Sequence, residues 1–101
     1  MANNKMRPIH PGEILREEFL APLDMSANAL AMALHVPAPR INDVVRERRG
    51  ITPDTALRLA RYFNTTAQFW LNLQTAFDLK QVELEVGSKI AEEVRPLDKA
   101  A

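Results

Sequence analysis

Apolar side chains recur at helical spacing in five short segments of the chain, and prolines, glycine and capping residues separate these segments. The first helix is expected over residues 13–20, because Pro11 suits a first helical position and Pro22 is expected to end the helix. The second is expected over residues 27–34, with Ser26 as its N-cap. Both helices are short, so each must bury its apolar face against the others.

Two prolines mark the start of the third segment. Pro37 and Pro39 can be accommodated only before or within the first turn of a helix, which is expected over residues 38–47. Gly50 is expected to close this helix. The pattern therefore predicts a short helix with a firmly fixed beginning.

The fourth and fifth helices carry clear signals at their ends. Thr52 is an N-cap for the fourth, and Asn64 can take the left-handed conformation that ends it. Residues 65–68 have the capping-box spacing for the fifth, which carries a long apolar stripe. No strand is predicted, so the expected fold class is all-α, a compact five-helix bundle.

The formal net charge is zero, but the charges are segregated along the chain. Residues 36–62 hold six arginines against three acidic residues, whereas residues 72–101 hold four basic residues against six acidic ones. The planar guanidinium group suits phosphate and the guanine edge better than the ammonium group of lysine does. The basic middle of the chain is thus a candidate nucleic-acid surface, although solvated helix faces also carry many arginines.

The second and third helices have helix-turn-helix spacing. Residues 27–34 and 38–47 are joined by a turn of about three residues, the arrangement that presents the N-terminal end of the second helix to the DNA major groove. The prolines would then fix where a recognition helix begins. An ordinary corner between two helices in a small core has the same spacing, and the spacing by itself leaves both readings open.

A family resemblance favours the DNA-binding reading. The stretch "SANALAMALHVPAPRINDVVRERRGITPDTALRLARYF", residues 26–63, resembles the helix-turn-helix of the Xre/Cro repressor-like (lambda-repressor-like) family. Together, "RPIHPGEILREEFL", "RRGITPDTALRLARYF" and "QFWLNLQTAFDL" resemble HigA, the antitoxin of HigB–HigA toxin–antitoxin modules. The resemblance covers about residues 7–80 and implies a dimer that binds a palindromic operator in its own promoter. It also implies a toxin partner, a HigB-like mRNA endonuclease that the antitoxin neutralises.

The resemblance also implies which residues would face DNA. Those near base edges or phosphates would be Ala38, Pro39, Arg40, Asn42, Asp43 and Arg46, and those facing the backbone would be Ser26, Asn28, Arg48, Arg49 and Thr52. Arg40 can fork onto guanine, and Asn42 can pair with adenine or a phosphate. Asp43 would be repelled by phosphate, so we expect it to accept from a cytosine amino group or to orient Arg40 or Arg46.

Two positions depart from the wider family pattern. Ala27 stands where many of these domains have a phosphate-anchoring glutamine, which puts the strength of that contact in doubt. His35 stands where the turn often has a left-handed glycine, a conformation that histidine tolerates at some cost.

The fifth helix has more apolar surface than a small core can absorb. We expect the excess to form a homodimer interface, which would supply the twofold symmetry of operator half-sites about 34 Å apart. The expected dimer residues are Phe69, Trp70, Leu73 and Phe77. The expected division is then a flexible N-terminal arm (1–8), a DNA-binding domain with a C-terminal dimerisation helix (9–85) and a tail (86–101).

The toxin is expected to contact the first helix. Its acidic residues Glu13, Glu17 and Glu18 could face a basic nuclease. Two functional alternatives remain: a stand-alone Xre-type repressor without a toxin, and a helical interaction domain that does not bind DNA.

An enzyme is not expected. The chain has no cysteine, and its two histidines offer neither metal-ligand spacing nor a partner for a serine nucleophile. No cofactor, metal or small-molecule substrate is therefore predicted. No secretory signal or membrane span is recognised, so the expected location is the cytoplasm.

Overall fold

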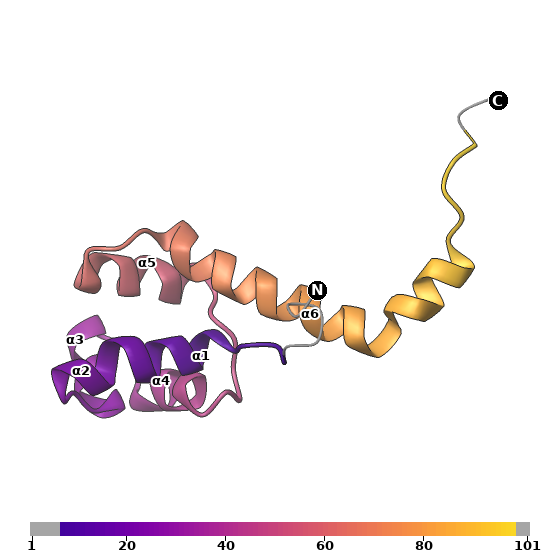
Figure 1. The fold of residues 1–101 in the computed structure, drawn as a ribbon. Coiled ribbons are helices and arrows are strands. Elements are labelled where there is room, and N and C mark those ends of the chain that lie inside the picture. Colours follow the sequence, from indigo (N-terminus) through magenta and orange to yellow (C-terminus); the bar gives the residue numbers. More distant parts are fainter. Residues whose placement is uncertain (1–6, 99–101) are drawn as a thin grey trace.

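The computed structural model describes residues 7–98, and every regular element in that range is helical (Figure 1). The all-α prediction is confirmed. The first helix consists of α1 (Pro11–Ile14), η2 (Leu15–Leu20) and α2 (Ala21–Leu23), which follow one another without a break. It is followed by α3 (Ala27–Leu34), α4 (Ala38–Val45), α5 (Pro53–Phe63) and α6 (Ala67–Glu93).

The first helix continues through Pro22, so the expectation that Pro22 ends it is wrong. The middle segment η2 is a π-helix, in which the N–H of Ala21 donates to the carbonyl of Arg16, five residues back. Proline has no N–H to donate and its ring crowds the preceding turn, and the wider π-turn accommodates both effects. The helix instead ends after Leu23, where Asp24 has a left-handed backbone with φ of 51°.

The turn between α3 and α4 follows the sequence prediction closely. Ser26 caps α3, since its hydroxyl accepts from the N–H of Ala29 at 3.0 Å. His35 ends α3 in the left-handed conformation with φ of 60°. Pro37 precedes α4 with an extended backbone, so α4 begins where the prolines predict.

The end of α4 differs from the prediction. The helix stops at Val45, because Glu47 takes a left-handed backbone with φ of 64°. Gly50 does not have a positive φ and plays a different part. A Cβ at Gly50 would lie 2.9 Å from the side-chain oxygen of Gln74, so the glycine allows close packing of the loop against α6.

Helix α6 is much longer than expected. The capping-box spacing places the cap at Thr65, whereas the N-cap is Thr66, one residue later. The helix also runs to Glu93 and crosses the expected boundary between residues 85 and 86. Its second half projects beyond the other helices (Figure 1), and the molecule extends 57 × 26 × 22 Å as a result. The predicted bundle is therefore only part of the molecule.

The core lies where the first helix, α3, α4 and α5 meet the beginning of α6. Leu15, Leu30, Ile41 and Leu59 are fully buried there, together with Trp70. Among residues 7–98, no helix is long and apolar enough to cross a membrane.

Candidate nucleic-acid interface

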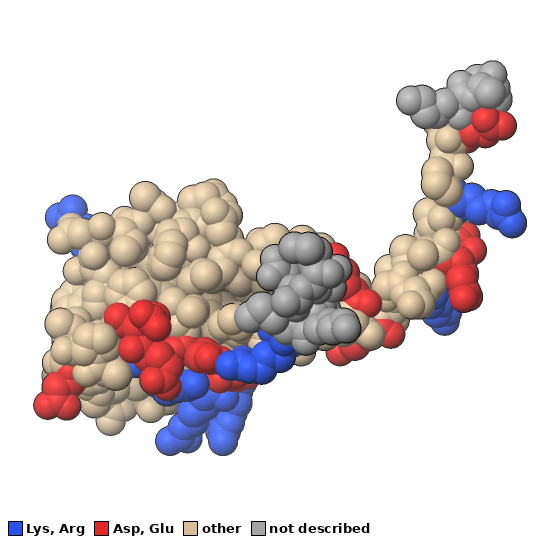
Figure 2. Space-filling view, in the orientation of Figure 1, with Lys and Arg blue, Asp and Glu red and all other residues tan. Residues whose placement is uncertain are grey.

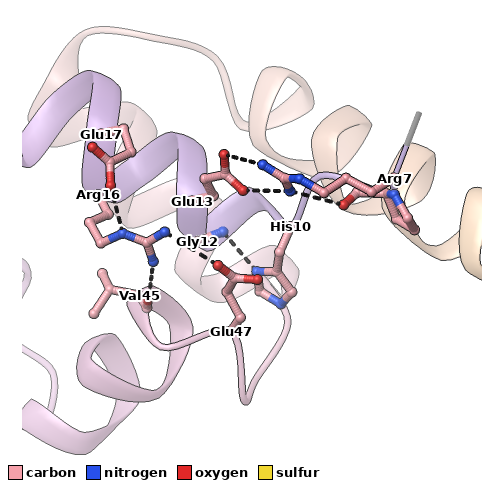
Figure 3. A network of polar contacts seen from close by, with 9 residues as sticks. Arg7, His10, Gly12, Glu13, Arg16, Glu17, Val45 and Glu47 are labelled. Atoms are coloured by element: carbon pink, nitrogen blue, oxygen red, sulfur yellow. Dashed lines mark hydrogen bonds and ion pairs between the residues drawn. The ribbon is translucent and has the colours of Figure 1, made fainter. Parts of the chain in front are cut away.

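Helix α4, the expected recognition helix, is held at its C-terminal end by the first helix. Gly12 lies so close to α4 that a Cβ there would be 1.8 Å from the carbonyl oxygen of Val44. Arg16 donates to the carbonyl of Val45 and to the carboxylate of Glu47, at 3.3 Å (Figure 3). These contacts satisfy a free carbonyl at the end of α4 and fix α4 against the first helix.

The middle of α4 is tied to the beginning of α3 by two asparagines. The side-chain nitrogen of Asn42 donates to the side-chain oxygen of Asn28 at 2.7 Å and to the carbonyl of Ala38 at 3.0 Å. The two residues were both predicted to contact DNA, and the structure brings them together across the helix pair. Their amide groups thus form one polar unit at the junction of α3 and α4.

Arg40 is not free. Its Nη1 donates to the carboxylate of Asp54, and the same oxygen accepts from Nε of Arg58 at 2.9 Å. Arg58 also donates to the carbonyl of Leu34 at the end of α3, at 2.8 Å. These hydrogen bonds lower the pKa of the Asp54 carboxyl, and the hydrogen bond from Arg58 has the larger effect. A chain of contacts therefore links α3, α5 and α4.

Asp43 has a different partner from the expected ones. Its carboxylate lies 3.4 Å from Nη2 of Arg49, in the loop after α4, and not beside Arg40 or Arg46. The expectation that it orients Arg40 or Arg46 is wrong, because the loop turns back at Glu47 and brings Arg49 beside α4.

Most of the remaining predicted residues are exposed to solvent. Pro39, Arg46, Arg48 and Thr52 are exposed, and Ala38 is half-buried. The guanidinium groups of Arg46 and Arg48 form no hydrogen bond or ion pair within residues 7–98. Figure 2 shows basic side chains projecting from the edge of the body at which α4 lies in Figure 1.

Sequence reasoning missed two residues that shape this surface. Asp54 holds Arg40, and Gln74 on α6 accepts from the N–H of Ile51 at 2.7 Å, which anchors the loop after α4. The i, i+4 spacing of Asp54 and Arg58 could have indicated their ion pair. Nothing in the sequence indicates that Gln74 meets residue 51.

Comparison with known proteins agrees with this arrangement. A helix-turn-helix family model matches residues 15–70. Antitoxin HigA-1 of Vibrio cholerae is 37% identical over 79 residues, which cover 78% of this chain and 74% of that protein. The chain belongs to the HigA family of helix-turn-helix antitoxins.

Solved structures resemble this HigA-family chain closely. Pseudomonas aeruginosa antitoxin HigA with the higBA promoter is 56% identical, with a TM-score of 0.89, and the match covers 91% of this chain and all of that one. Antitoxin GraA in complex with its operator is 55% identical, with a TM-score of 0.87, over 92% of this chain and 94% of that one. Virulence-associated protein I of Dichelobacter nodosus is 68% identical over 80 residues, 79% of this chain and 74% of that protein.

The acidic residues expected to meet the toxin differ in their surroundings within this HigA-family fold. Arg7 donates to both carboxylate oxygens of Glu13 at 2.9 Å, and its hydrogen bonds lower the pKa of Glu13 (Figure 3). Glu17 accepts from Arg16 at 2.9 Å. Glu18 is exposed and has no such partner among residues 7–98. The three carboxylates are thus not one uniform acidic face.

The expected dimer residues also separate into two groups. Trp70 is 0% exposed within a single chain, and its Nε1 donates to Thr65 at 2.8 Å. Its assignment to a dimer interface is therefore wrong, because the core of its own chain already covers it. Phe69 is 38% exposed.

Leu73 and Phe77 are half-buried and line a groove of about 330 Å³ with Ile9 and Ile14. His10 packs against Phe77, one of the residues that line the groove. It is buried, its Nδ1 accepts from the N–H of Gly12 at 2.8 Å, and its ring meets that of Phe77 edge-on with 4.8 Å between centroids.

Proposed function

We propose that this chain is the antitoxin of a toxin–antitoxin module, which neutralises a HigB-like mRNA endonuclease and represses its own operon as a dimer on a palindromic operator. The observation that carries the proposal is the helix-turn-helix of α3 and α4 in a chain that is 56% identical to a HigA solved with its promoter. The operator and the toxin would both be cytoplasmic, and so would this chain.

For DNA recognition we propose the surface around α4. Arg40 would read a guanine, and the Asn28–Asn42 pair would contact an adenine or a phosphate. Arg46, Arg48 and Arg49 would meet phosphates, to which exposed guanidinium groups are attracted without regard to sequence.

For the dimer we propose a face made of Phe69, Leu73 and Phe77, extended by the groove beside Ile9 and Ile14. Apolar side chains that remain partly exposed along one helix are typical of an interface. Replacing Leu73 by Asp would place a charge in this face. We expect the variant to be monomeric in sedimentation analysis and to lose most of its operator affinity, whereas Leu97→Asp, on an exposed residue after α6, would change neither.

For the toxin we propose the first helix, and the structure suggests a graded test. Glu18→Ala removes an unpaired carboxylate, whereas Glu13→Ala also frees Arg7. The triple Ala variant of Glu13, Glu17 and Glu18 should weaken toxin binding while operator binding stays intact. An unchanged affinity of the triple variant for the toxin would remove this surface from the proposal.

The first experiment is fluorescence anisotropy of the purified protein on a duplex from its own upstream region and on a scrambled duplex, at two salt concentrations. We expect tight, sequence-preferring binding with two subunits per site. Arg40→Ala should relax the preference at one base pair, and Arg48→Ala should weaken both duplexes alike and reduce the salt slope by about 0.9. A chain with no preference at either salt concentration would not be a repressor. A reading frame for a small basic nuclease next to this gene would favour the antitoxin over a stand-alone repressor.

A further inference from the structure

We propose that Asp54 is a specificity-determining residue of the DNA-binding surface and that it acts through Arg40. Asp54 orients the guanidinium group of Arg40 toward a base edge and makes a phosphate a poor ligand for Arg40. The inference rests on the proposed operator binding. It concerns a residue on α5, outside the α3–α4 helix pair, for which DNA contact was not predicted.

The contact between Asp54 and Arg40 leaves the arginine able to bind a base. Arg40 donates from Nη1 to Asp54, and a guanidinium group has five N–H donors. The side chain of Arg40 is 31% exposed, so the donors that Asp54 does not use remain available to a ligand. Arg40 can therefore keep Asp54 and fork onto the two acceptors of guanine at the same time.

Asp54 itself is held firmly from the other side. The oxygen that accepts from Arg40 also accepts from Arg58, one helical turn further along α5. Arg58 is fixed in turn by the carbonyl of Leu34. The Asp54 carboxylate is thus held in one position beside α4, where it can orient Arg40. An ion pair this exposed adds little to the free energy of unfolding.

The position of Asp54 gives it a second effect. It lines a hollow of about 180 Å³ with Arg40, Arg49, Thr52 and Thr55. Arg49 and Thr52 are predicted to face the DNA backbone, so Asp54 places a negative charge where a phosphate would approach. Its side chain is 56% exposed, and its pKa is lowered by the two arginines, so it is ionised at neutral pH. The carboxylate weakens the attraction of Arg40 for a phosphate, whereas it does not repel the uncharged edge of guanine.

Asp54→Asn tests the proposal, because asparagine has nearly the same shape without the charge. We expect affinity for the scrambled duplex to rise about fivefold at low salt and the ratio of operator to scrambled affinity to fall about tenfold, within the range that one bidentate arginine–guanine contact contributes. Asp54→Glu, which keeps a carboxylate, should restore most of the ratio. Glu92→Gln makes the same charge change at the exposed end of α6 and should leave the ratio unchanged.

The dependence on Arg40 is tested in a double-mutant cycle. In the Arg40→Ala background, Asp54→Asn should no longer change the ratio. An equal rise in affinity for both duplexes, no change for either, or the same fall in the ratio without Arg40 would overturn the proposal. A wild-type protein with no preference for its own upstream duplex would instead overturn the proposed function, so the two failures are distinguishable. Melting curves of each variant confirm that it is folded.

Discussion

Replacing Gly12 by Ala tests how closely the recognition helix depends on the first helix. The added Cβ would lie 1.8 Å from the carbonyl oxygen of Val44 and 2.8 Å from its carbonyl carbon. Because a carbon and an oxygen approach each other ordinarily to about 3.3 Å, the gap between α1 and α4 must widen by about 1.5 Å. The obstacle is buried backbone, which cannot rotate away as a flexible side chain would.

The size of the effect follows from this geometry. Overpacking a core costs about 1–3 kcal/mol, and a clash with buried backbone belongs at the upper end, at about 3 kcal/mol. The better helix propensity of alanine returns at most about 1 kcal/mol. We therefore expect a net loss of about 2–3 kcal/mol and a Tm lower by roughly 10–20 °C for a domain of this size.

Thermal unfolding followed by circular dichroism measures the loss, and Gly87→Ala is a matched control. Gly87 lies within α6, and the nearest atom to a Cβ there is 3.9 Å away, on Glu83. The control should leave Tm unchanged or raise it, because alanine favours a helix over glycine. A Gly12→Ala protein that melts with the wild type would refute the inferred contact between the helices. A folded variant with weakened operator binding would show that the contact also positions α4.

Further changes at Gln74, His10 and His35 test the local reasoning. Gln74→Leu leaves the N–H of Ile51 without an acceptor and should lower the unfolding free energy in urea by about 1–3 kcal/mol, whereas Gln74→Glu, which keeps an acceptor, should lose less. Burial lowers the pKa of His10 in the folded protein, so this histidine binds a proton more readily in the unfolded chain. The Tm of the protein should therefore fall as the pH drops below about 6.5, the ordinary pKa of histidine. His10→Asn, which keeps a capping acceptor, should reduce that pH dependence. His35→Gly relieves a left-handed backbone and should raise the unfolding free energy by roughly 0.5–1 kcal/mol.

Helix beginnings and two of the helix ends could be predicted because their causes are local. Ser26 and Thr52 each accept a hydrogen bond from an N–H three residues later, which is the geometry that their sequence positions predict. Thr66 does the same for α6, one residue after the cap that the capping-box spacing predicts. Asn64 takes the left-handed conformation that ends a helix, as its position also indicates, and His35 does so where the family pattern often has a left-handed glycine. The caps and Asn64 need only the neighbouring residues and work without knowledge of the fold.

The failures have causes outside the local sequence. Proline normally ends a helix, but the π-helical segment moves the hydrogen bonds away from Pro22. Trp70 looks like excess apolar surface when its helix is considered in isolation. In the fold, the ring of Phe19 lies 4.9 Å from that of Trp70, and the same ring is 4.9 Å from Phe63. Aromatic rings from the first helix and from α5 thus pack against Trp70, and periodicity along α6 alone cannot show this.

The arginines of the candidate DNA-binding surface also show what the sequence alone cannot predict. Counting residues identified the arginine-rich middle of the chain, yet it treated each arginine as equally available to DNA. In the structure Arg40 and Arg49 are paired with Asp54 and Asp43, whereas Arg46 has no such partner within residues 7–98. An unpaired guanidinium group binds any phosphate, and a paired one is oriented before the ligand arrives. The carboxylates that bring the net charge to zero thus divide the arginines into those held in place by a neighbouring carboxylate and those left unpaired for a ligand.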